Sequence, residues 1–262
     1  MVFARAALGV LIGFALAFAF HFGVLKGFGA STGFALTFGL IVGLIGGAYA
    51  AIAFSFTIYE VGALSIVGLI SDLTWSMLNT IAGFAVWIPA CLIVGGTFQN
   101  DDNTRRSGTF AYDKNPRDPN GSTYGATTIG TVIGGGWSSH EETHVWQARI
   151  FGPAYMVVYI LSLVMNILFR LITGKTSDLV TQAYYRICFE DWAYLGGSTG
   201  GGSIRWGGWV GGLFLCLLYV SLAVLITAGA AIHSIVLSLI ATAGLLIYSL
   251  IRALTPDANS GA

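Results

Sequence analysis

Two long apolar runs open this chain and limit what it can fold into. Residues 2–25 and 32–56 are mainly apolar, and Arg5 is the only Lys, Arg, Asp or Glu within them. About 20 apolar residues in a helix are enough to cross the hydrocarbon layer of a membrane. A short turn at residues 26–29 separates the two runs, so they predict a helical hairpin of two membrane spans.

The composition of the rest of the chain also predicts a membrane protein. Only 9% of the 262 residues are charged, whereas soluble domains carry about 25%. So few charged side chains cannot cover a soluble surface of this size, and the lipid bilayer is the expected partner. The net charge of zero argues against a nucleic-acid partner. The first apolar run is as long as a full span, so we expect a retained helix rather than a cleaved signal peptide.

Four further runs bring the predicted number of spans to about six. The segment 61–96 is apolar but interrupted, which predicts an interfacial piece and then a span over about 78–94. Residues 153–172 predict the next span, and residues 209–228 and 232–250 predict a closing hairpin. The residues that interrupt the segment 61–96 are Asp72, Thr74, Asn79 and Pro89.

The segment 97–139 differs from the rest because it is rich in charged residues, Pro and Gly, so we expect it outside the membrane. Residues 109–112 and 127–133 have strand-like composition, and three glycines at 134–136 end the second strand. The predicted fold class is therefore mainly α: a polytopic integral membrane protein of about six transmembrane helices with a small β-containing extramembrane insert.

Residues 140–144 read HEETH, an HExxH pattern in a chain with only four histidines. On a helix, residues four apart share a face, so His140 and His144 can bind one metal ion. Glu141 lies on a neighbouring face, where its carboxylate could accept a proton from water on the metal. The pattern therefore predicts a helix that carries a zinc site, with Glu141 as the general base.

These predictions divide the chain into successive parts. They are an N-terminal transmembrane hairpin (1–60), a broken membrane segment (61–96), the insert (97–139), the HExxH helix with a membrane helix and a return helix (140–195), a C-terminal transmembrane hairpin (203–254) and a polar tail (255–262).

A catalytic zinc site has three protein ligands and an open position, so a third ligand is required. Glu190 is the first candidate, because a carboxylate in the apolar, aromatic segment 184–193 is costly unless it is paired or bound to metal. Asp191 is a competing ligand. Arg186, one turn before Glu190, offers an ion pair instead of a metal.

The third ligand must also return from the far end of a membrane helix. If residues 173–190 form a return helix of about 26 Å, Glu190 comes back to the level of Gly152. Tyr194, or alternatively Tyr185, could then donate a hydrogen bond to the oxyanion that develops on a peptide carbonyl.

Two further features predict how a peptide substrate is held. Gln147 lies near the face of the two histidines, where its amide could orient a ligand or the substrate. The strand 127–133, just before the HExxH helix, could pair with an extended peptide by strand addition.

The same residues resemble a known group of proteins. Residues 140–155 read HEETHVWQARIFGPAY, and YR at 185–186 and FEDWA at 189–193 follow. With TWSMLNT at 74–80, this pattern resembles a group of uncharacterised bacterial membrane proteins with an HExxH zincin signature. It is more distantly similar to gluzincin membrane proteases of the CAAX prenyl protease and heat-shock membrane protease type.

This resemblance covers roughly residues 70–195. It implies a zinc ion held by His140, His144 and Glu190, with Glu141 as the base of a membrane-embedded peptidase of the bacterial inner membrane. The chain departs from the pattern in one respect: those proteases usually carry Asp directly after the Ala of Glu-x-x-Ala, where this chain has Tyr194. In those proteases that Asp supports a histidine ligand, so the resemblance does not identify the group that supports a histidine here.

Two alternatives compete with a catalytic site. His140 and His144 could be polar residues of an amphipathic helix, or the ligands of a structural or vestigial metal site. The chain could also be an accessory subunit of a larger membrane complex, or a homo-oligomer, packed through faces of small residues. Packing between its own spans would use the same faces, which carry Gly9 and Gly13, then Gly39, Gly43 and Gly47, and finally Gly207 and Gly211.

Overall fold

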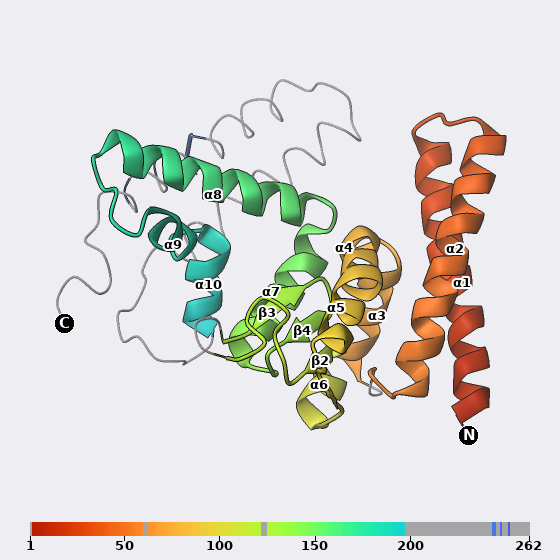
Figure 1. Cartoon of the computed structure of the whole chain (residues 1–262). Coiled ribbons are helices and arrows are strands. Elements are labelled where there is room, and N and C mark those ends of the chain that lie inside the picture. Colours follow the sequence, from red (N-terminus) through yellow and green to blue (C-terminus); the bar gives the residue numbers. More distant parts are fainter. Residues whose placement is uncertain are drawn as a thin grey trace. The chain divides into compact units, whose positions relative to one another are not determined.

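A computed structural model describes residues 2–59, 62–121 and 125–196, together with positions 243, 244, 247 and 251 (Figure 1). The chain forms two compact units, residues 1–153 and residues 154–262, which are described one after the other. The predicted C-terminal hairpin and the polar tail lie outside the described residues, apart from the four isolated positions.

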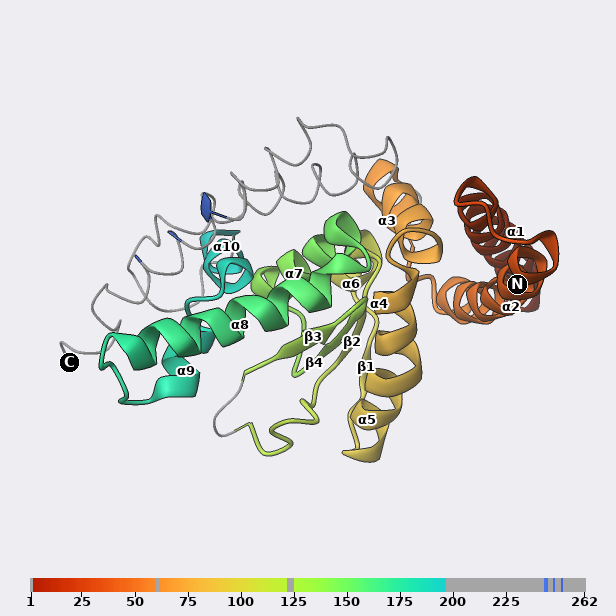
Figure 2. The same ribbon diagram turned by 90° about the horizontal axis from the view of Figure 1, so that it is seen from above.

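The described part of the chain is mainly helical, as predicted. Three helices are long and apolar enough to cross a membrane: α1 (Val2–Gly27), α2 (Thr32–Ser55) and α8 (Ala154–Ile172). A fourth span is possible if α3 (Ala63–Leu73) and the helical stretch Met77–Ile93 count as one, although the chain bends by 84° between them (Figure 2). The described residues therefore contain three or four of the predicted spans.

The first two helices pack with their backbones in close approach. A Cβ atom at Gly13 would lie 2.3 Å from the carbonyl oxygen of Gly46, and one at Gly9 would lie 2.4 Å from that of Ala50. The rings of Phe14 and Phe18 cover the glycines of α2 on the same interface. The small-residue faces of α1 and α2 are therefore used within the hairpin, while the face with Gly207 and Gly211 lies outside the described residues.

The predicted span over 78–94 is built from three helical pieces. These are α4 (Met77–Ala82), a π-helical turn η1 (Gly83–Trp87) and α5 (Ile88–Ile93). Pro89 lies in the first turn of α5, and its ring prevents a regular α-helical hydrogen bond to the preceding turn. Because Gly83 has no side chain, η1 can approach the carbonyl oxygen of Ile129 in the neighbouring sheet.

The segment after α5 forms a four-stranded sheet in the order β1-β2-β4-β3. The pair β2–β4 is parallel and the other two pairs are antiparallel. The single strand predicted over 127–133 is wrong, because the chain turns back at Gly130 with a φ of +59°. The strands are β1 (Phe98–Gln99), β2 (Phe110–Tyr112), β3 (Thr127–Ile129) and β4 (Val132–Gly134), and the helix α6 (Asp102–Ser107) lies between β1 and β2.

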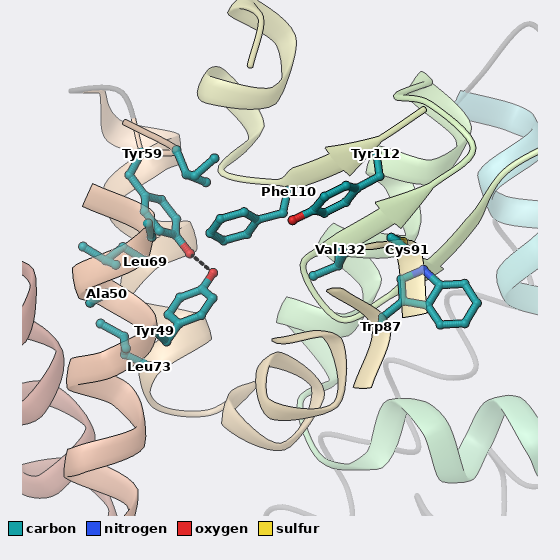
Figure 3. Packing of buried hydrophobic residues seen from close by; sticks show 12 residues of the cluster. Tyr49, Ala50, Tyr59, Leu69, Leu73, Trp87, Cys91, Phe110, Tyr112 and Val132 are labelled. Carbon is teal, nitrogen blue, oxygen red and sulfur yellow. Dashed lines mark hydrogen bonds between the residues drawn. The ribbon is translucent and has the colours of Figure 1, made fainter. Parts of the chain in front are cut away.

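The two faces of this sheet meet different helices. Phe110, Tyr112 and Val132 face a core that also contains Tyr49 of α2 and Trp87 of η1 (Figure 3). On the opposite face, Ala111 and Ile133 pack against Val145 of the HExxH helix. The sheet thus lies between α2 and η1 on one face and α7, the helix that carries the histidines, on the other.

The HExxH segment forms the helix α7 (Ser139–Phe151), as predicted. Ser138 caps its start, and Gly152, with a φ of +52°, ends it. The last carbonyls of a helix have no partner within it, and side chains from the bend between α3 and α4 donate to them. The donors are Ser71 to Arg149 (2.9 Å), Ser76 to Ala148 (2.9 Å), Trp75 to Ile150 (3.2 Å) and Asn79 to Gly152 (2.7 Å).

A buried ion pair joins the same two segments. Nη2 of Arg149 lies 2.8 Å from Oδ2 of Asp72, and both side chains are almost fully shielded from solvent. Burial is the largest influence and by itself would lower the pKa of Arg149, but the charge and hydrogen bonds of Asp72, together with Tyr59 and Tyr49, raise that pKa above its ordinary value. The guanidinium also donates to the carbonyls of Ser107 (2.6 Å) and Gly108 (2.8 Å).

Two tyrosines extend this ion pair toward the sheet. Tyr59 donates to Oδ2 of Asp72 at 2.6 Å. Burial and the charge of Asp72 raise the pKa of Tyr59 well above its usual value, so its hydroxyl stays protonated. The Tyr49 hydroxyl lies 2.6 Å from that of Tyr59 and 3.3 Å from Oγ1 of Thr131, in the β3–β4 turn. The network therefore connects α2, α3, α7 and the sheet.

The second unit begins with α8 and does not contain the predicted continuous return helix. Residues after α8 form two short helices, α9 (Leu179–Tyr184) and α10 (Cys188–Gly196). Gly174 and Asp178 have positive φ values, +72° and +45°, which a helix cannot contain. The segment nevertheless runs back along α8, because Arg170 donates to the carbonyl of Ser177, Asn166 to that of Ala183 and Tyr159 to the Glu190 carboxylate.

Removal of Arg149 should destabilise the first unit strongly. We expect Arg149→Met to cost about 3–5 kcal/mol, because it leaves the Asp72 carboxylate buried without its counter-ion. Arg105→Met, which breaks the exposed pair with Asp102, should cost less than about 1 kcal/mol. Thermal unfolding of the purified protein in detergent measures both, and equal losses would contradict the importance of the buried pair.

A second pair of variants tests the close approach of α1 and α2. Gly13→Ala should destabilise the hairpin by about 1–3 kcal/mol, because the new methyl group would overlap the backbone of Gly46. Gly23→Ala, in the same helix with nothing within 4 Å of its Cβ position, should be neutral or slightly stabilising. The same unfolding measurement compares them, and a neutral Gly13→Ala would rule out this packing.

Candidate metal centre

The two histidines of the HExxH pattern point toward one another from a single face of α7. His140 and His144 are one helical turn apart and both are buried. Their Nε2 atoms lie 3.2 Å apart. The predicted helix and the predicted common face are therefore both confirmed.

This separation suits a tetrahedral metal ion. Two Zn–N bonds of about 2.0–2.1 Å at a tetrahedral angle place the nitrogen atoms about 3.3 Å apart, close to the observed 3.2 Å. Imidazole nitrogen is also a ligand that zinc prefers. The two side chains thus fit a zinc ion in both geometry and chemistry.

Gln147 orients one of these imidazoles, as the sequence predicted. Its side-chain oxygen lies 2.9 Å from Nδ1 of His144. An amide oxygen can only accept a hydrogen bond, so Nδ1 carries the proton and Nε2 presents its lone pair. Gln147 therefore supports one of the two candidate histidine ligands from the same helix.

The predicted general base, Glu141, is buried beside the histidines on the first turn of α7. Its Oε2 accepts a hydrogen bond of 2.5 Å from the hydroxyl of Thr128, in the middle of β3. Sequence analysis did not single out Thr128. The contact depends on β3 forming its own strand and presenting this residue to α7, and no local pattern signals that.

Glu190, the predicted third ligand, lies on α10 and is buried. Its Oε1 accepts a hydrogen bond of 2.6 Å from Tyr159 of α8, a partner that the sequence did not predict. The ring of Tyr159 also stacks on Phe189, with ring centroids 6.1 Å apart. His140, His144 and Glu190 are three buried residues whose side chains could together hold a metal ion.

The other predicted residues of the second unit lie on or next to α10. Asp191 directly follows Glu190, and Tyr194 lies one turn further along the same helix. The ring of Tyr194 is 6.1 Å from that of Tyr185, the alternative donor. The contribution of either tyrosine to an oxyanion site stays a prediction.

No model of a protein family, no curated protein and no solved structure matches this chain. The resemblance of residues 74–80, 140–155 and 185–193 to zincin-like membrane proteins therefore stays a prediction.

Loss of the Gln147 side-chain oxygen should weaken metal binding without destroying the site. We expect Gln147→Leu to lower zinc affinity about 10–100-fold, because the His144 ring loses the partner that fixes its tautomer and orientation. Glu142→Leu serves as a control, because Glu142 lies on the same helix but is not one of the candidate metal ligands, and this change should leave the zinc affinity unchanged. Zinc competition with a chromophoric chelator measures both, and equal affinities in the two variants would contradict this role of Gln147.

Proposed function

We propose that this chain is a zinc-dependent, membrane-embedded peptidase. The observation that carries the proposal is the 3.2 Å separation of the two Nε2 atoms, with the tautomer of His144 set by Gln147. In this proposal His140, His144 and Glu190 hold the metal, and Glu141 is the general base.

The path of the chain supports Glu190 as the third ligand. Tyr159, which binds Glu190, lies about 8 Å along α8 from its first residue, Ala154. The bond to Tyr159 thus brings the carboxylate back to the beginning of α8, although no continuous return helix is present.

The charge of the three ligands also suits the proposed ion. Two neutral imidazoles and one carboxylate leave a net positive charge at a bound Zn²⁺, so the site can attract the lone pair of a substrate carbonyl. A zinc ion in this position would activate water and polarise a peptide carbonyl. Glu141 would take a proton from the attacking water and deliver it to the leaving amine.

The sheet supports an extended peptide as the substrate. In the described part of the chain β3 is the last strand of the sheet and pairs only with β4. An unpaired strand edge can accept an extended peptide as an additional strand. Because Thr128 of β3 donates a hydrogen bond to Glu141, a peptide on this edge would pass close to the base. We propose that Tyr194 or Tyr185 then donates a hydrogen bond to the oxyanion.

The finer membrane topology is part of the same proposal. We propose about six spans, with the segment 97–139 outside the bilayer, in a bacterial inner membrane. The three helices α1, α2 and α8 support a membrane location. The high content of apolar residues in 209–228 and 232–250 supports the remaining hairpin.

Metal analysis of purified variants tests the site. The wild-type protein should contain about one zinc per chain, as expected for a site with three protein ligands. We expect His140→Ala and Glu190→Ala to lose this zinc, while Glu142→Ala keeps it. No metal in the wild-type protein would exclude the site. Full zinc content in Glu190→Ala would exclude Glu190 as the third ligand. Asp191 would then be favoured as the ligand, or Glu190 would be paired with a residue such as Arg186.

Hydrolysis of fluorescein-labelled casein in detergent tests the activity. Glu141→Gln should keep the zinc but lower kcat at least about 100-fold, because the amide cannot accept the proton. If the wild-type protein binds zinc but cleaves nothing, or if Glu141→Gln cleaves as fast as the wild type, the alternative of an accessory subunit with a structural metal site would replace the peptidase.

A further inference from the structure

We propose that Thr128 is a positioning residue for the general base: its hydroxyl holds one oxygen of the Glu141 carboxylate so that the other oxygen faces the reacting water. This inference rests on the proposed peptidase function. It concerns two residues of the same unit, Thr128 in β3 and Glu141 in α7.

The hydrogen bond itself is short and directed. Oγ1 of Thr128 lies 2.5 Å from Oε2 of Glu141 and 3.4 Å from the backbone oxygen of the same residue. A hydroxyl has a single proton to donate. The shorter distance assigns it to the carboxylate, where a charged acceptor makes the stronger bond.

The sheet determines where this hydroxyl points. In the register of β3 and β4, Thr128 lies opposite Ile133, and directly opposed residues share a face of an antiparallel pair. Ile133 packs against Val145 of α7. Thr128 therefore faces α7, while its strand neighbours Thr127 and Ile129 face the other side of the sheet.

Both ends of the bond are held by the rest of the unit. Two hydrogen bonds fix the β3–β4 turn at Thr131. Its hydroxyl accepts one from Tyr49, and its carbonyl accepts one of 2.9 Å from the Phe110 amide. The position of α7 is fixed by Arg149, through its ion pair with Asp72. The donor and the carboxylate thus belong to elements that cannot shift easily relative to each other.

A single fixed donor has a defined effect on a carboxylate base. Rotation about the last side-chain bond of glutamate is only weakly restricted by itself, so an isolated carboxylate samples many planes. A donor on Oε2 selects one plane and leaves the lone pairs of Oε1 for the water proton. Because a small misplacement of a reacting group can lower a rate about 100-fold, the hydroxyl should affect kcat.

Four variants test this role: Thr128→Val, Thr128→Ser, Thr143→Val and Glu141→Gln. Thr128→Val has nearly the shape of the native residue but cannot donate, and we expect kcat for labelled casein to fall about 10–100-fold. KM and zinc content should not change, because the hydroxyl donates to Glu141 rather than to a proposed metal ligand, and strand addition on β3 would use its backbone groups. Thr128→Ser restores the donor and should recover most of kcat.

Thr143→Val is the matched control within the HEETH segment. Its hydroxyl donates to the backbone carbonyl of Ser139 rather than to the base, so its removal should leave kcat near the wild-type value. Unfolding temperatures of all variants separate a fold defect, which would lower zinc content and raise KM as well, from loss of positioning.

The outcomes distinguish the two proposals. A wild-type protein without zinc or without cleavage would overturn the peptidase and the role of Thr128 together. If zinc binds and Glu141→Gln is inactive, but Thr128→Val cleaves at the wild-type kcat or Thr128→Ser fails to recover, the positioning role alone is wrong.

Discussion

The buried pair of Asp72 and Arg149 is the interaction on which the first unit depends. Two charges removed from water are tolerated only when nearly every donor and acceptor is used. Arg149 meets this condition through Asp72 and the carbonyls of Ser107 and Gly108, and Tyr59 completes the surroundings of the carboxylate. Separating these elements would leave a buried charge unpaired, which costs free energy. The ion pair therefore keeps α3, α6 and α7 in one arrangement.

The proposed centre takes its geometry from this arrangement. The bend between α3 and α4 supplies Asp72 and also the side chains that cap the end of α7, so the helix with both histidines is held at its carboxyl end. The tyrosine pair continues to the β3–β4 turn and holds the strand that carries Thr128. Elements supported in this way hold the two histidines in place before a metal binds.

Residues close together in sequence were predictable, and distant partners were not. Gln147 was expected near the histidines because residues three apart on a helix lie on the same face. Thr128 and Tyr159 were missed, since each meets its glutamate across 13 or 31 residues. The broken return segment was missed because its apolar spacing resembles a helix, whereas Gly174 and Asp178 interrupt it.

The sequence by itself determined the membrane-type helices, the helical HExxH face and the chemical nature of the candidate ligands. Those features follow from hydrophobic run length and from the 3.6-residue repeat, which act within a few residues. Only the tertiary structure decided that the segment 127–133 turns at Gly130 and that a threonine binds the base. It also decided that a tyrosine of α8 binds Glu190. Such contacts depend on strand register and on which helix faces pack together, and these are settled by the burial of many side chains at once rather than by any local pattern.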